Sequence, residues 1–304
     1  MENNKRVQKA HSEDYFGEYR DFWWNLDFLK LRLQALELDN VQDVLDLGCG
    51  VGHWGQLLAR VLNNNFNLIG IDKEEASIAK AKERAIERNL NKRFQYQVGD
   101  VYSLPFPDNF FDLVTCQTLL IHLPDPKKAL KEMLRVTKTK GTVLLAEPNN
   151  FANGAIGDSV TQKMRTDEIV NQIRFDLILQ QGKKALNLGY NSEGDFLPGY
   201  LAELGAENIK VYLSDKTTPF FPPYETEEQK VNIQQMKEWS KRDFLGWEKQ
   251  DMKKYFVAGG GSFEEFEKLW NERQKRFQQI IKEVEAGTYH SAGGAIQYLI
   301  AAKK

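Results

Sequence analysis

The feature that most constrains the fold is the passage from residue 42 to residue 55, QDVLDLGCGVGHWG. Val44, Leu45 and Leu47 end a predicted strand, and a turn that contains three glycines follows. Trp54 then begins a run of apolar residues at helical spacing. A strand that leads into a helix through a glycine turn predicts the first unit of a parallel α/β sheet.

The same alternation of strand and helix continues as far as residue 147. Asp125 and Pro126 form a good N-cap and first-turn pair for one of the helices. After Asn150 the rhythm breaks into polar helical stretches and loops, and strand patterns return near residue 209 and near the end of the chain. The further strands are predicted at 66–71, 94–98, 111–116, 142–147, 209–213 and 295–301.

Composition limits the partners and the compartment. The net charge of -2 argues against a large basic surface, so we expect no nucleic-acid partner. No apolar run reaches the ~20 residues that a membrane span requires, and the N-terminal segment lacks the apolar core of a secretory signal. Cys49 and Cys116 are most simply interpreted as free thiols, so a cytoplasmic location is expected.

The glycine turn is suited to hold a ligand against the first amides of the helix that follows. Gly48, Gly50 and Gly52 allow close approach of a ligand and positive φ angles. Asp72 ends the second strand, where a carboxylate accepts hydrogen bonds from ribose hydroxyls. Because residues 50–55 also match the dinucleotide pattern G-x-G-x-x-G, NAD is an alternative at this point.

Two acidic residues favour a different nucleoside cofactor. Asp46 lies two residues before the first glycine, where a carboxylate can face a positively charged ligand group. Asp100 follows the third strand, where it can accept from an adenine amino group. We therefore favour a cationic nucleoside cofactor over NAD.

In combination, these motifs resemble those of the class I S-adenosylmethionine-dependent methyltransferases. VLDLGCGVG at 44–52 looks like the first motif of that family, and IGID at 69–72 looks like its acidic second-strand motif. The stretch from Gly99 to Asp112, with LPF and NFFD, resembles the small-molecule subgroup typified by ubiquinone and menaquinone biosynthesis methyltransferases. The similarity covers about residues 40–150.

The resemblance implies a binding site for S-adenosyl-L-methionine, with S-adenosyl-L-homocysteine as the product. The glycine turn would pass beneath the methionine portion, Asp46 would lie near its ammonium group, and Asp72 would bind the ribose. Asp100 and Val101 would contact adenine, and Gln117 would line the methyl-transfer end. The implied cofactor-binding residues are Asp46, Gly48, Cys49, Gly50, Asp72, Lys73, Gly99, Asp100, Val101 and Gln117.

The expected architecture follows from the strand pattern and the resemblance together. It is an α/β fold with a Rossmann-like, doubly wound, seven-stranded, mainly parallel sheet, a helical N-terminal lid, and helical insertions after strands five and six. The expected segments are a lid at 1–38, a cofactor core at 39–150, a helical insertion at 151–192, core at 193–216, a substrate cap at 217–290 and the last strand at 291–304.

Few residues qualify as proton acceptors for the reaction. His122 lies in the loop after the fourth strand, where the family often has a histidine, and it can equally shape the pocket without moving protons. Glu147 ends the fifth strand and is either a substrate contact or a structural cap. His290 and Tyr15 complete the candidates. The four histidines are scattered in the sequence, so no metal site is expected.

Aromatic residues outside the core are the candidates for substrate contact. Five of the six tryptophans lie outside the cofactor region, which indicates either helix packing or a lid over an apolar acceptor. The candidate substrate-binding residues are Tyr19, Trp23, His122 and Phe220.

The predicted function is in-line methyl transfer to a small, apolar or aromatic metabolite. The alternatives are a protein or RNA methyltransferase on the same fold, a non-catalytic S-adenosylmethionine-binding regulator, and an NAD-dependent oxidoreductase. The sequence does not indicate an oligomeric state.

Overall fold

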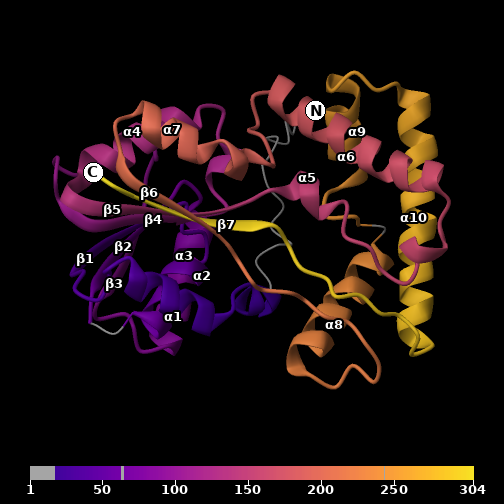
Figure 1. The fold of residues 1–304 in the computed structure, drawn as a ribbon, viewed down its shortest axis with the longest axis horizontal. Helices are drawn as coiled ribbons and strands as arrows, with labels where there is room; N and C mark the ends of the chain where they lie inside the picture. The colour runs from indigo at the N-terminus through magenta and orange to yellow at the C-terminus, as the bar shows by residue number, and fades with distance from the viewer. Residues whose placement is uncertain (1–17, 63–64, 243) are drawn as a thin grey trace, which may run out of the picture. The chain divides into compact units, whose positions relative to one another are not determined.

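The computed structural model describes residues 18–62, 65–242 and 244–304 (Figure 1). The chain divides into two compact units. The core unit consists of Arg20–Asn149, Ser192–Lys216 and Ile296–Lys304, and the helical unit contains Asn150–Asn191 and Thr217–Ala295.

The core unit is built on a seven-stranded sheet in the order β3-β2-β1-β4-β5-β7-β6. The first five strands are parallel, and β7 runs antiparallel between β5 and β6. The strands are β1 (Asp43–Leu47), β2 (Asn67–Asp72), β3 (Phe94–Val98), β4 (Phe111–Gln117), β5 (Thr137–Pro148), β6 (Glu207–Leu213) and β7 (Gln297–Lys303). The predicted Rossmann-like, seven-stranded and mainly parallel sheet is confirmed.

Helices cover both faces of this sheet, as Figure 1 shows. Helices α1 (Leu26–Ala35), α2 (His53–Val61) and α3 (Glu75–Glu87) lie on one face, and their apolar side chains join one buried cluster with Leu68 and Leu113. Helices α4 (Pro126–Val136) and α7 (Leu197–Glu203) lie on the other face, around Leu45 and Val114. Since both faces are covered, the central strands β1 and β4 are buried along most of their length.

The predicted N-cap of α4 at Asp125 is confirmed. The Asp125 side chain accepts a hydrogen bond from the backbone N–H of Lys128, and Pro126 occupies the first helical turn. Strand β5 begins at Thr137, five residues before the predicted start, because Thr137 already pairs with Phe111. The short 3-10 helices η3 (Leu120–His122) and η5 (Glu193–Asp195) belong to the core unit, as do Arg20, Asp21 and Phe22 of η2 (Glu18–Phe22).

Residues 20–38, which the sequence placed in the lid, belong to the core unit in the structure. The reason is packing, since Trp24, Phe28, Leu29 and Leu33 are buried in the same cluster as the helices beside the glycine turn. Trp24 lies 5.5 Å from Trp54 between ring centroids. This segment therefore packs as part of the core unit.

The helical unit has a core of its own, formed mainly by aromatic residues such as Phe175, Phe256 and Phe266. Gly182 lets two of its helices pack closely, because a Cβ there would lie 1.6 Å from the carbonyl oxygen of Tyr255. The elements of this unit are α5 (Asn150–Asn153), η4 (Thr161–Lys163), α6 (Thr166–Ala185), α8 (Glu227–Lys241), α9 (Lys249–Ala258) and α10 (Phe263–Glu285).

Candidate active site

The predicted cofactor residues meet at the carboxyl ends of β1 to β4. In this sheet the strand order reverses between β1 and β4, and ligands of open α/β folds bind outside the carboxyl ends of strands at such a point. The glycine turn follows β1, with φ angles of 60° at Gly48, 52° at Gly50 and 83° at Gly52. Three left-handed residues within five positions explain why glycine is needed there.

The turn also has no room for side chains. A Cβ on Gly48 would lie 2.6 Å from Cδ1 of Leu119, and a Cβ on Gly52 would lie 2.9 Å from the Tyr96 hydroxyl. Cys49 lies between the first two glycines, where its backbone N–H donates to the carbonyl of Ile71 at 3.0 Å and its thiol is buried. The N–H group and the thiol of Cys49 are therefore both engaged within the protein.

Asp46 is fully buried beneath the turn. Its Oδ2 accepts a hydrogen bond from the backbone N–H of Gly55 at 3.1 Å, and its Oδ1 has no partner among the described residues. Burial raises the pKa of Asp46 to about 8. A buried carboxyl oxygen without a partner is costly, so this position is suited to a cationic ligand group.

Asp72 connects the second strand to the glycine turn. Its Oδ2 accepts from the N–H of Gly50 at 2.9 Å, and its Oδ1 accepts from the N–H of Glu74 at 3.0 Å. Both oxygens keep further lone pairs, because a carboxylate has about four acceptor positions. Asp72 can thus hold the turn and accept from ribose hydroxyls at the same time.

The residues after β3 form the next part of the same edge. The N–H of Gly99 donates to the Asp72 carbonyl at 3.0 Å, which places Gly99 and Asp100 beside the end of β2. Asp100 is exposed, and its Oδ1 accepts from the N–H of Tyr102 at 2.9 Å. Val101 is buried, whereas Lys73 is exposed. The predicted adenine-side residues therefore share one edge of the sheet.

The end of β4 supplies Gln117, which is buried and pairs in register with Ala146 of β5. The following loop is held by Glu147, whose Oε1 accepts from the N–H groups of Leu119 at 2.8 Å and Leu120 at 2.9 Å. Burial raises the pKa of Glu147 to about 7. His122 ends the short helix η3 in this loop and is half-buried.

The remaining predicted site residues do not all belong to this unit. Tyr15 lies outside the described residues. Trp23 is in the core unit, with the Arg20 guanidinium 4.4 Å from its ring centroid. Tyr19 and Phe220 belong to the helical unit, where Tyr19 contacts Trp239 and Phe220 contacts Tyr289 with centroid separations of 6.4 and 5.7 Å. These two aromatic residues have packing partners within that unit.

Arg20 was not among the residues predicted for the site. Burial raises the pKa of Asp46 and lowers that of His53, and the positive charge of Arg20 partly offsets the first effect and adds to the second. Arg20 precedes the glycine turn by about thirty residues and belongs to no motif. The sequence feature that could have drawn attention to Arg20 is its position just before Trp23 and Trp24, whose side chains pack on the core.

His53 opens α2 and belongs to a charged cluster with Asp21. Its Nδ1 lies 3.1 Å from Asp21 Oδ1 and 3.0 Å from an Arg84 nitrogen, while Arg88 donates to Asp21 Oδ2 at 2.8 Å. The hydrogen bond with His53 and the Arg88 charge hold the pKa of Asp21 well below its usual range. Burial lowers the pKa of His53, and the hydrogen bond with Asp21 partly offsets this effect. The cluster therefore joins Asp21, the residue after Arg20, to α2 and to the C-terminal end of α3.

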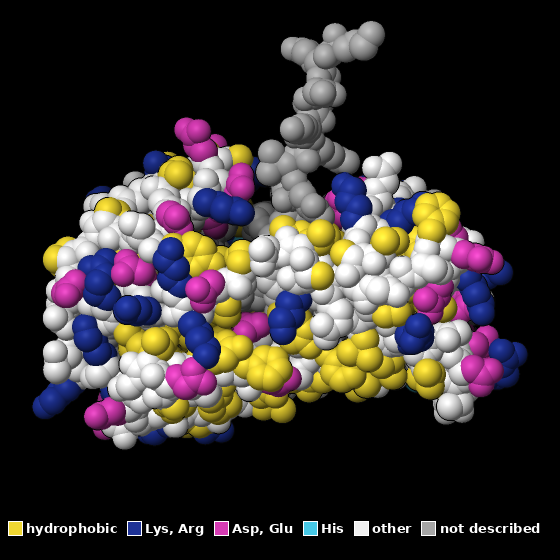
Figure 2. Space-filling view, turned by 90° about the horizontal axis from the view of Figure 1, so that it is seen from above, with side chains coloured by type: hydrophobic (Ala, Val, Ile, Leu, Met, Phe, Trp, Pro, Cys, Tyr) yellow, Lys and Arg dark blue, Asp and Glu magenta, His cyan; other side chains and the backbone are white. Residues whose placement is uncertain are grey.

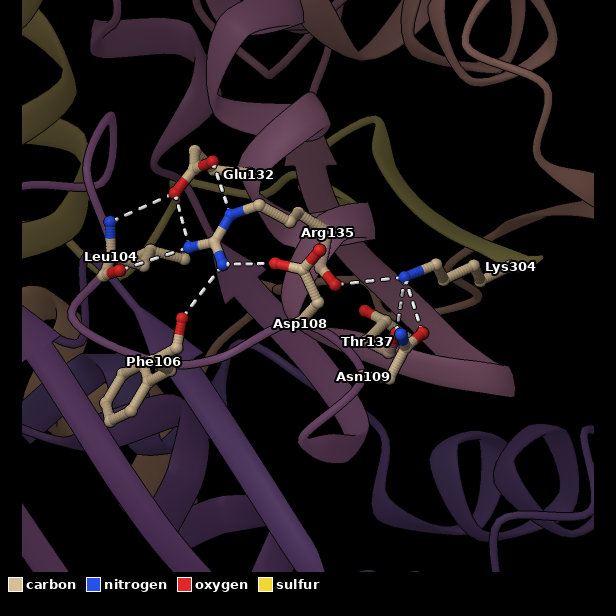
Figure 3. Close-up of polar contacts among 8 residues, drawn as sticks. All are labelled: Leu104, Phe106, Asp108, Asn109, Glu132, Arg135, Thr137 and Lys304. Carbon is tan, nitrogen blue, oxygen red and sulfur yellow. Dashed lines mark hydrogen bonds and ion pairs between the residues drawn. The ribbon is translucent and has the colours of Figure 1, made fainter.

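The LPF and NFFD passage has a structural role (Figure 3). The Arg135 guanidinium donates to the carbonyls of Phe106 at 2.8 Å and Leu104 at 3.1 Å, and to the carboxylates of Asp108 and Glu132. Lys304, the last residue, donates to Asn109 Oδ1 at 2.8 Å. A planar guanidinium is suited to such a set of acceptors, so Arg135 fixes the loop that carries Asp100 and Val101 into place.

Other kinds of site find little support. Within residues 18–62, 65–242 and 244–304, no cluster of His, Cys, Asp and Glu could hold a metal ion. Nor does any described helix have the length and apolarity to cross a membrane. On the face in Figure 2, basic and acidic side chains are interspersed.

Comparison with known proteins identifies the family. A family model described as a methyltransferase domain matches residues 38–193. The chain belongs to the methyltransferase domain family. It is 34% identical over 134 residues to a demethylmenaquinone methyltransferase of Lactobacillus johnsonii, with 44% of this chain and 53% of that protein covered. It is 28% identical over 200 residues to a norajmaline N-methyltransferase of Rauvolfia serpentina, with 62% and 63% covered.

Among solved structures, this methyltransferase-family chain is similar to the YcgJ protein of Bacillus subtilis. The TM-score is 0.48 and the identity 17%, with 91% of this chain and 98% of that chain covered. The match to the Lactobacillus johnsonii protein spans about half of that relative's length.

Proposed function

We propose that the protein binds S-adenosyl-L-methionine at the carboxyl ends of β1 to β4 and transfers its methyl group to a small-molecule acceptor. The observation that carries this proposal is Asp46, whose Oδ1 is buried beneath the glycine turn without a described partner. An ammonium group is the natural complement of such an oxygen. The methyl donor has one at its methionine end, whereas the ribose and phosphate groups of NAD do not.

The chain's own residues fit the rest of the donor. Asp46 would hold the ammonium group, and Arg20, whose charge acts on Asp46, would pair with the carboxylate of the methionine portion. Asp72 would accept from the ribose hydroxyls beside Gly50. Asp100, Val101 and Lys73 would surround adenine, and Gln117 would line the methyl-transfer end.

The donor supplies a methyl group on a sulfonium, which is already activated for displacement. The protein mainly has to orient the acceptor and exclude water. A hydroxyl or amine acceptor would also have to lose a proton, and His122 at the end of η3 is the candidate acceptor of that proton. Tyr15, Tyr19, Trp23 and Phe220 remain candidates for contact with the methyl acceptor.

A small acceptor is favoured over RNA by the near-neutral charge of the chain and by the mixed charges of the surface in Figure 2. It is also supported by the relatives, whose names contain the small molecules demethylmenaquinone and norajmaline. Because the match spans about half of the first of these proteins, the acceptor of this chain is proposed by chemical class alone.

Incubation with methyl-labelled S-adenosylmethionine and a fractionated cell extract tests the proposal. We expect label to enter the small-molecule fraction with the wild-type protein, and to be lost with the Asp46→Asn and Asp72→Ala variants. Label that enters only the protein or the RNA fraction contradicts the proposed acceptor class.

A further inference from the structure

Glu147 occupies an unusual position in the core unit. It lies near the carboxyl end of β5, a strand with neighbours on both sides, and its side chain is 0% exposed. An apolar side chain would cost less free energy to bury at this position than a carboxyl group does, which indicates that Glu147 has a specific role.

The Glu147 carboxyl group accepts hydrogen bonds mainly from backbone groups, and the Cys116 thiol is a further donor at 3.6 Å. Its Oε1 accepts from two successive N–H groups, those of Leu119 at 2.8 Å and Leu120 at 2.9 Å, while the N–H of Thr118 donates to the neighbouring Ala146 carbonyl at 3.0 Å. Successive N–H groups in a turn form a concave site for an anion. Here the carboxyl oxygen of Glu147 occupies that position, so β5 holds the loop after β4 in place.

This loop has a strained conformation that requires such support. Thr118 has a φ of 55°, which a β-branched residue rarely adopts, and its Oγ1 is buried without a described partner. Backbone strain of this kind persists only where the surroundings determine the conformation. The left-handed residue turns the chain so that the next two N–H groups point to one carboxylate oxygen.

The consequence of the turn is the position of Leu119. A Cβ on Gly48 would lie 2.6, 3.1 and 3.2 Å from Cδ1, Cγ and Cβ of Leu119, so this side chain packs directly on the glycine turn. The loop also begins at Gln117 and ends at His122. Glu147 thus controls, through two hydrogen bonds, a side chain that supports the turn beneath the methyl donor.

We propose that Glu147 is a positioning residue, which fixes the loop of residues 118–122 so that Leu119 supports the glycine turn for cofactor binding. This inference rests on the proposed function and assigns Glu147 a role other than that of the general base. The role depends on an oxygen that accepts two N–H groups. Glutamine provides such an oxygen and alanine does not.

The test is calorimetric titration with S-adenosylhomocysteine of the wild type and of the variants Glu147→Gln, Glu147→Ala, Leu119→Ala and the double alanine variant. We expect affinity to fall about tenfold in Glu147→Ala and about fivefold in Leu119→Ala, and to stay within about threefold of the wild type in Glu147→Gln. The double variant should bind about as weakly as Glu147→Ala, since both changes remove the same contact. A folded Glu147→Ala variant with wild-type affinity overturns the proposal.

A second measurement separates this proposal from the proposed function. Amide hydrogen exchange at Leu119 and Leu120 should be about tenfold faster in Glu147→Ala and close to the wild-type rate in Glu147→Gln. If the wild type does not bind S-adenosylhomocysteine, the proposed function fails while exchange still reports on Glu147. If Glu147→Ala does not fold, Leu119→Ala decides, because unchanged affinity in that variant contradicts the proposal and weakened affinity supports it.

Discussion

The carboxylate of Asp72 accepts a hydrogen bond from the backbone N–H of Gly50 at 2.9 Å, which joins the end of β2 to the glycine turn after β1. One side chain therefore fixes the shape of the turn and offers further acceptor positions to a ligand beside it. The turn and the proposed ribose-binding position are not separate elements, because they share this carboxylate.

Replacement of Asp72 by alanine should weaken S-adenosylhomocysteine binding by about tenfold or more, since both roles are lost. The measurement is calorimetric titration. Asp112 provides a matched control, because its carboxylate accepts from the N–H groups of Gln42 and Asp43 at the start of β1, the opposite end of the sheet. Asp112→Ala should lower stability without changing affinity, and equal affinity losses in the two variants would contradict the assignment.

Cofactor binding should release a proton from Asp46. Its pKa is raised to about 8, so the carboxyl is mostly protonated at pH 7 in the free protein. An ammonium group beside Oδ1 favours the charged form, which lowers the pKa and releases about one proton. Affinity should therefore rise with pH up to about pH 8. Titration at pH 7 in buffers with different ionisation enthalpies measures the release, and Asp46→Asn should abolish it. Equal release by that variant would assign the proton to another group.

Glycine should be more stable than threonine at position 118. The φ of 55° strains a β-branched residue, and the hydroxyl is buried without a described partner. We expect Thr118→Gly to raise the free energy of unfolding by about 1 kcal/mol. Lys140, exposed and at a φ of 65°, serves as the comparison, and Lys140→Gly should stabilise the protein less. Chemical denaturation measures both, and a Thr118→Gly variant less stable than the wild type would show that the threonine is not strained.

Arginine at position 135 should not be replaceable by lysine. An ammonium group cannot satisfy the carbonyls of Leu104 and Phe106 together with the two carboxylates that surround the guanidinium. We expect Arg135→Lys to cost about 1–2 kcal/mol of unfolding free energy. The matched change Arg242→Lys, at an exposed pair with Glu248, should cost less than about 0.5 kcal/mol. Similar losses in the two variants would mean that the network in Figure 3 contributes no more to the free energy of unfolding than an exposed ion pair does.

The relative positions of the candidate cofactor residues could largely be predicted from the sequence, because chain connectivity determines them. Parallel strands that follow one another end at the same edge of a sheet, so a carboxylate at the end of β1 and another at the end of β2 must lie close together. For that reason the spacing of Asp46, Gly48 and Asp72 was sufficient to predict that these residues lie at one edge of the sheet. Their detailed contacts, such as the second role of Asp72 at Gly50, depend on side-chain conformations that no spacing specifies.

Residues placed by tertiary packing were not predictable in the same way. Arg20 acts on Asp46 because the aromatic residues after it pack on α2, and Asp21 meets His53 and Arg88 across three separate elements. The role of Glu147 depends on a left-handed threonine, which the sequence does not indicate. Aromatic content alone could not distinguish packing from substrate contact, since large aromatic side chains favour both.

The central claim is that the glycine turn and the carboxylates around it bind a methyl donor and not a dinucleotide. Calorimetric titration of the wild-type protein with S-adenosylhomocysteine, and separately with NADH, tests it most directly. We predict saturable binding of S-adenosylhomocysteine that weakens in Asp72→Ala, and no binding of NADH. Binding of NADH without binding of S-adenosylhomocysteine would contradict the account.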